Sequence, residues 1–173
     1  PVAFTGATIH TMTGPSGTGT VENGTLVIHN GEIVAVGANV AIPAGAEVRD
    51  ATGMVIMPGI VDTHSHIGQV SGADSSAAIQ PDVRALDSIN VRDSSIARAR
   101  SGGVATANIM PGSGFLMSGQ TFYMHLTDGT TIEDYAWMDD DGDIMGGMKM
   151  ANGTNPLREN PAFPSTRARS AAM

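Results

Sequence analysis

The chain has 173 residues, of which 41% are hydrophobic and 4% aromatic, a composition that allows a sizeable buried core. Nine basic and 17 acidic residues give a formal net charge of −8, which argues against nucleic-acid binding because that needs a basic face. Cysteine is absent, so disulfides and thiolate metal sites are excluded, and any metal must be held by His, Asp, Glu or a modified Lys.

The first third of the chain predicts small β-structure. Alternating apolar residues between turn-forming residues indicate strands at 4–10, 24–29, 32–37 and 47–51. Asn30-Gly31 predicts a hairpin turn, because both residues tolerate positive φ. We expect a first domain over residues 1–53 and a second over residues 54–173.

The second part begins with a continuous apolar stretch, Met54–Met57 with Ile60-Val61, which predicts a strand covered on both faces. Helical spacing of Val83, Leu86 and Ile89 predicts a helix over 82–100 that ends at Gly102-Gly103. A further apolar strand is expected at 104–110, which completes a βαβ unit. Later segments predict strands at 121–126 and 146–151 and a helix that begins at Ser165 or Thr166.

The most informative motif is Met57-Pro-Gly-Ile-Val-Asp-Thr-His-Ser-His66. Alternate residues of a strand point to the same face, so His64 and His66 project together from the end of the first strand of the second part. Two imidazoles on one side of a rigid element form half of a metal site. The alternative is a pair of histidines that are simply hydrogen-bonded at a strand end. We expect Asp62 to position the strand end and not to bind the metal directly.

With these motifs, the chain resembles the N-terminal part of the metal-dependent amidohydrolases, most closely the imidazolonepropionase-like and prolidase-like members. The resemblance is carried by four segments spread over the chain: Asn23–Gly37, Met57–His66, Ser101–Thr106, and Met110–Ser113 with Ser118–Gln120.

The resemblance implies an α/β fold, with residues 1–53 in a small flanking β-sandwich and residues 54–173 as the first strands and helices of a (β/α)8 TIM barrel. It implies hydrolysis of amide-type C–N bonds, in non-peptide compounds or dipeptides. A divalent metal, zinc in the first place and as one or two ions, would be held by His64 and His66. A carboxylated Lys or its equivalent, two later His and a late Asp complete the ligands in the family, and the late Asp acts as the general base.

A complete barrel takes about 250 residues, far more than follow residue 53, so the chain is expected to be incomplete. The catalytic base and the other ligands would lie beyond Met173, so no catalytic residue is expected within this chain. The expected partners are the remaining C-terminal part, as the same or a separate polypeptide, further copies in a homo-oligomer, and a small-molecule substrate. A non-catalytic assembly role is the alternative, because an unfinished barrel exposes open sheet edges.

Three residues are candidates for substrate contact. Ser113 and Gln120 flank the loop after the second strand, where barrels place their active-site mouth, although turn chemistry would also explain them. Lys149 is the sole lysine and could anchor an anionic group, or it could be a partly buried lysine that extends to solvent. No apolar run is long enough for a membrane span. The compartment stays open between cytoplasm and a periplasmic or secreted location after removal of an upstream segment.

Overall fold

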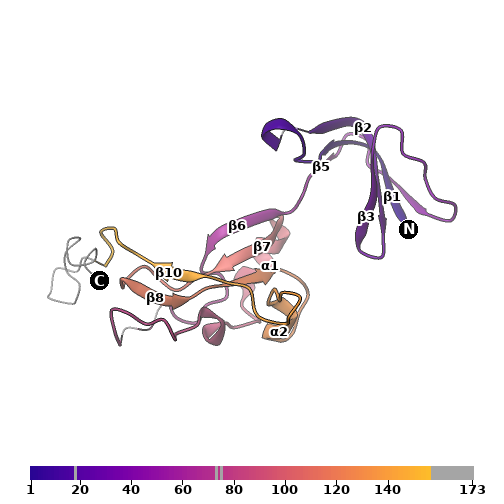
Figure 1. Ribbon diagram of the computed structural model, residues 1–173. Coiled ribbons are helices and arrows are strands. Elements are labelled where there is room, and N and C mark those ends of the chain that lie inside the picture. The colour runs from indigo at the N-terminus through magenta and orange to yellow at the C-terminus, as the bar shows by residue number, and fades with distance from the viewer. Residues whose placement is uncertain (18, 73, 75, 157–173) are drawn as a thin grey trace. The chain divides into compact units, whose positions relative to one another are not determined.

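Figure 1 shows the computed structural model, which describes residues 1–156 apart from 18, 73 and 75. The chain divides into two compact units, Pro1–Pro58 and a second unit that begins at Gly59. The helix expected from Ser165 or Thr166 lies outside the described residues. Within the described part, no helix is long and apolar enough to cross a membrane.

The first unit is a five-stranded mixed sheet. β1 lies at its centre, antiparallel to β2 and parallel to both β4 and β5, and β3 forms the far edge beside β2. All four strands predicted in this region are present. Its core cluster consists of Ala7, Ile9, Leu26 and Ala51, and Ala3 and Val27 are fully buried as well. The strands span Val2–His10 (β1), Thr20–His29 (β2), Glu32–Gly37 (β3), Glu47–Asp50 (β4) and Val55–Ile56 (β5), with a 3-10 turn at Pro15–Gly17.

The predicted hairpin turn is confirmed. Asn30 and Gly31 have φ values of +50° and +82°, and they connect β2 to β3. A two-residue turn of this hand matches the twist of the flanking strands, which explains why Asn-Gly at this point determines the register of the hairpin.

The second unit contains the predicted βαβ unit. β6 (Ile60–Ser65) and β7 (Val104–Ile109) run side by side and parallel in Figure 1, with the helix α1 (Ser94–Ser101) between them in sequence. Residues Ile96, Ala107, Ile109, Phe122 and Met124 are buried at the centre of this unit. The other elements are a 3-10 turn at Ala85–Ser88, β8 (Met117–Gln120), β9 (Phe122–His125), α2 (Ile132–Tyr135) and β10 (Met148–Met150).

The predicted helix over 82–100 is only partly correct. The observed α-helix covers Ser94–Ser101. The first half of the predicted helix is instead the short 3-10 turn and a loop. Asn90 Oδ1 accepts a hydrogen bond from the Arg92 backbone N–H, and Asp93 Oδ1 accepts one from the Ser95 N–H. These side chains cap backbone donors locally and start the helix at residue 94, in competition with the helical pattern upstream.

The expectation of one strand covered on both faces at 54–61 is wrong. Pro58-Gly59 separates two strands, β5 beside β1 and β6 beside β7. Val55 of β5 is 60% exposed. Ile60 and Val61 of β6, the edge of a three-stranded sheet with the order β6-β7-β9, are 48% and 57% exposed.

The strands that follow β7 do not extend a parallel sheet. β9 is antiparallel to β7, and β10 pairs with β8 in a separate two-stranded sheet. The described residues therefore form mainly mixed β-sheets with few helices, and they close no barrel.

Candidate metal centre

The two predicted ligands lie together at the carboxyl end of β6. His64 is the second-last residue of β6, and His66 is the first residue after the strand. Their ring centroids are 5.4 Å apart and the ring planes meet at 79°, so the two imidazoles face a common region edge to face. Both histidines are exposed.

The carbonyl of Met110 holds His66. His66 Nδ1 lies 2.7 Å from the Met110 carbonyl oxygen, at the carboxyl end of the neighbouring strand β7. A carbonyl only accepts hydrogen bonds, so Nδ1 carries the proton and donates it. In the neutral ring, Nε2 then keeps a free lone pair, the state that a metal ligand needs.

Met110 also connects the carboxyl ends of β6 and β7 through hydrogen bonds. The Met110 backbone N–H donates to the Ser65 carbonyl over 3.0 Å, and Gln69 Nε2 donates to the Met110 carbonyl over 2.8 Å. The Met110 carbonyl therefore accepts from both His66 and Gln69, which uses both of its lone pairs.

Lys149 is the third predicted site residue at this place. Its Nζ lies 3.4 Å from His64 Nε2 and donates to Met110 Sδ over 3.4 Å. Lys149 is only 9% exposed. Burial lowers the pKa of the Lys149 amine, because a desolvated ammonium is unfavourable when no carboxylate compensates it.

The donor set fits part of a metal site. The two imidazoles are nitrogen donors suited to zinc and similar ions, which prefer three or four protein ligands. Within the described residues, no group of three or more His, Cys, Asp or Glu could hold a metal ion. Asp62 uses its carboxylate locally, since its Oδ1 accepts from the His64 backbone N–H over 3.1 Å.

The three candidates for substrate contact are not all brought together. Ser113 and Lys149 line one polar hollow of about 320 Å³, together with residues 150–156. Gln120 lies at another hollow, beside Arg84 and Asp143, and its amide donates to the Pro81 carbonyl over 2.8 Å.

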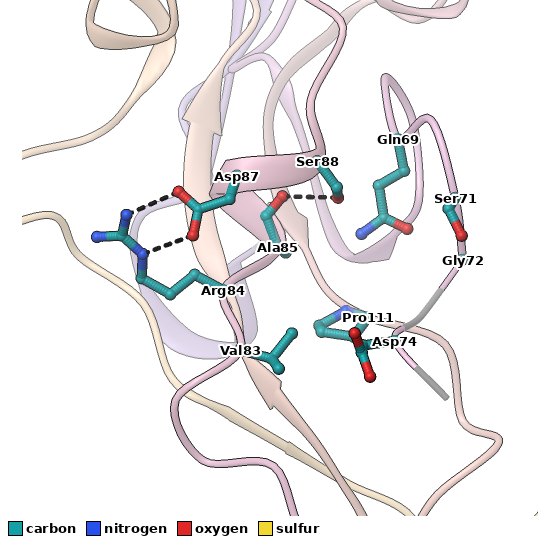
Figure 2. Close-up of a pocket in the computed structure, with 10 residues that line it drawn as sticks. All are labelled: Gln69, Ser71, Gly72, Asp74, Val83, Arg84, Ala85, Asp87, Ser88 and Pro111. Atoms are coloured by element: carbon teal, nitrogen blue, oxygen red, sulfur yellow. Dashed lines mark hydrogen bonds and ion pairs between the residues drawn. The ribbon is translucent and has the colours of Figure 1, made fainter. Parts of the chain in front are cut away.

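A larger hollow of about 510 Å³ is lined by Gln69 and by Pro111, the residue after Met110 (Figure 2). The figure shows the Gln69 side chain extending from its loop into the hollow. Arg84 and Asp87 form a bidentate ion pair at its rim, with N–O distances of 2.9 and 2.7 Å. The Arg84 guanidinium lowers the pKa of Asp87, chiefly through these hydrogen bonds.

Sequence reasoning missed Met110 and Gln69. Met110 acts through its backbone carbonyl and its sulphur, and residue type alone does not predict that role. The one available signal was position, since Met110 directly follows the second predicted strand and precedes Pro111.

Comparison with known proteins supplies the family. The solved structure of an amidohydrolase from Thermotoga maritima MSB8 superposes with a TM-score of 0.82 at 32% identity, over 99% of this chain and 45% of that chain. The chain belongs to the amidohydrolase superfamily. Over 42 residues it is 45% identical to a dihydroorotase of Mycobacterium tuberculosis, which covers 24% of this chain and 10% of that protein. Over 59 residues it is 41% identical to an imidazolonepropionase of Idiomarina loihiensis, which covers 33% of this chain and 14% of that protein.

No family model matches the chain. This amidohydrolase chain spans less than half the length of the solved relative and about a tenth to a seventh of these two curated relatives. The resemblance to the amidohydrolases that the motifs predict is confirmed. The match covers part of the relatives, of the kind expected for an N-terminal portion.

Proposed function

We propose that this amidohydrolase chain provides the first two metal ligands, His64 and His66, of a metal-dependent hydrolase of amide-type C–N bonds. The observation that carries the proposal is the hydrogen bond from His66 Nδ1 to the Met110 carbonyl, which leaves Nε2 available beside the His64 ring. The proposal includes a (β/α)8 barrel with a flanking β-sandwich. In that arrangement β6 and β7 are the first two barrel strands, and further segments complete the barrel.

The residues of this chain have defined tasks in that reaction. A divalent metal ion held there would lower the pKa of bound water towards neutrality and would polarise the scissile carbonyl. His64 and His66 would hold the ion through their outer nitrogens. The Met110 carbonyl keeps the His66 proton on Nδ1, and the Asp62 carboxylate fixes the backbone of His64. The general base and the remaining ligands would come from outside these 173 residues.

Lys149 lies beside the proposed ligands, in addition to them. Its Nζ is 3.4 Å from His64 Nε2. The same Nζ donates to the sulphur of Met110, the residue whose carbonyl accepts from His66. Ser113 lines the same hollow as Lys149, so both stay candidates for contact with the substrate.

The test compares two double variants in the full polypeptide that carries this chain. His64→Asn with His66→Asn removes both proposed ligands. His10→Asn with His29→Asn removes two histidines of the first unit and serves as the matched control. We expect the first variant to lose its metal, measured by elemental analysis, and its turnover of a panel of dipeptides, simple amides and cyclic imides. The control should keep both. Undiminished zinc in the His64/His66 variant would contradict the assignment.

The second candidate is a non-catalytic assembly role, favoured by the exposed apolar residues on the edge strand β6. Ile60 and Val61 are both exposed there. A protein with this role would associate with copies of itself or with a chain that completes its sheet, without bound metal and without turnover. Metal content therefore separates the two functions.

A further inference from the structure

Gln69 donates a hydrogen bond to the same carbonyl as His66. Gln69 Nε2 lies 2.8 Å from the Met110 oxygen, and His66 Nδ1 lies 2.7 Å from it. The orientation of the Gln69 amide follows from chemistry, because a carbonyl accepts only and the NH2 end must face it. The side chain therefore binds the group that determines which nitrogen of His66 carries the proton.

This arrangement contributes little to the stability of the fold. Gln69 Oε1 is buried without a hydrogen-bond partner in the described part of the chain. A buried acceptor without a partner is unfavourable, and it offsets what the single donated hydrogen bond provides. An apolar side chain of similar size would satisfy packing at least as well, so stability alone does not explain a glutamine at this position.

The backbone around Gln69 is held firmly. The Gly68 N–H donates to Ser95 Oγ of α1 over 3.1 Å, and the Gly68 carbonyl accepts from the Asn90 N–H over 2.7 Å. On the other side, the Val70 N–H donates to the Ser88 carbonyl over 2.9 Å. A donor on such a tethered segment can hold its acceptor within a few tenths of an ångström, as a ligand-supporting group must.

We propose that Gln69 is a positioning residue of the metal centre. It holds the Met110 carbonyl toward His66, which keeps the proton on His66 Nδ1 and leaves Nε2 free to bind. The metal-binding part of this inference rests on the proposed function, whereas the effect on the His66 tautomer can be measured without any metal.

The test uses Gln69→Met in the full polypeptide, with Gln120→Met as the matched control. Gln120 makes the same kind of bond, from its amide to the Pro81 backbone carbonyl, also over 2.8 Å. Nitrogen NMR of the metal-free, 15N-histidine-labelled protein reports the tautomer of His66, with its signals assigned from His66→Asn. Zinc affinity is measured by competition with a chelator, and melting temperature is recorded for each variant.

We expect Gln69→Met to shift His66 toward the Nε2-protonated tautomer and to weaken zinc binding by roughly 10- to 100-fold. Its melting temperature should stay the same or rise, and Gln120→Met should leave tautomer and zinc affinity unchanged. Gln69→Glu is the second variant if Gln69→Met does not fold, because an ionised carboxylate cannot donate to Met110. The same shift of tautomer is expected from it.

The outcomes separate the two proposals. An unchanged His66 tautomer in a folded Gln69 variant overturns the positioning role, whatever happens to stability. If the His64/His66 double variant keeps its zinc, the proposed function fails, and the tautomer of His66 still decides the role of Gln69.

Discussion

At the scale of single residues, Met110 connects the proposed ligands. Its carbonyl accepts from His66, and its sulphur accepts from Lys149, whose amine also contacts His64. A displacement of Met110 would therefore change the positions of both histidine side chains. The sequence predicted the histidine pair because the metal-binding atoms of histidine are in its side chain, and alternate residues of a strand point to the same face. It could not predict Met110, since every residue has a backbone carbonyl and only the fold places this one beside His66.

Gly68 gives a prediction about stability at the turn between His66 and Gln69. Its φ is +77°, and an added Cβ would lie 3.2 Å from Ile96 Cδ1 in the core of the second unit. Gly68→Ala should lower the free energy of unfolding by about 1–3 kcal/mol from backbone strain, with a further loss from the contact with Ile96.

The matched control for Gly68 is Gly103→Ala. Gly103 has a φ of +90°, but no atom lies within 4 Å of an added Cβ. Denaturant unfolding of both variants should show the larger loss for Gly68→Ala. Equal losses would mean that the Ile96 contact relaxes without cost.

At the scale of elements, the start of α1 depends on one capping side chain. Asp93 accepts hydrogen bonds from the hydroxyl and the backbone N–H of Ser95, and these lower the pKa of Asp93. Because the carboxyl has a lower pKa in the folded state than in the unfolded state, its ionised form stabilises the fold above the unfolded pKa of about 4. This contribution is lost as the pH falls through the folded pKa.

Two substitutions separate the cap from its charge. Asp93→Asn keeps an acceptor for the Ser95 N–H and should retain most of the stability near pH 7, but it should lose part of the pH dependence below about pH 5. Asp93→Ala removes the acceptor and should lower the melting temperature at both pH values. Thermal unfolding by circular dichroism at pH 7 and pH 4 measures this. An Asp93→Ala variant as stable as the parent protein would show that α1 does not need the cap.

The same elements show how far the sequence could be used to predict this fold. The hairpin at Asn30-Gly31 and the strand–helix–strand order from β6 to β7 were predictable, because local turn chemistry and apolar periodicity determine them. The extent of α1 was not, because Asn90 and Asp93 compete with the apolar pattern. The split of the 54–61 stretch does not follow from the apolar pattern either, because apolar residues continue on both sides of Pro58-Gly59.

At the scale of the whole molecule, the exposed apolar residues and the charge have opposite effects. A formal net charge of −8 keeps copies apart, whereas β6 presents the exposed Ile60 and Val61 on a strand that, among the described residues, has one sheet neighbour. An edge strand of this kind offers unpaired backbone groups to another chain. Association should therefore increase when salt screens the charge, since repulsion between copies weakens and apolar contact does not.

The last prediction concerns this association in the 173-residue chain on its own. We expect its apparent mass, measured by light scattering, to rise above 17.7 kDa as protein concentration and salt increase. Val61→Lys should reduce the association, because a charged lysine on an edge strand opposes pairing with another sheet. Val70→Lys is the control, since Val70 is 77% exposed but lies outside the strands. If both lysine variants reduce association equally, net charge and not the β6 edge governs it, and a chain that stays monomeric throughout would remove the basis for the assembly role.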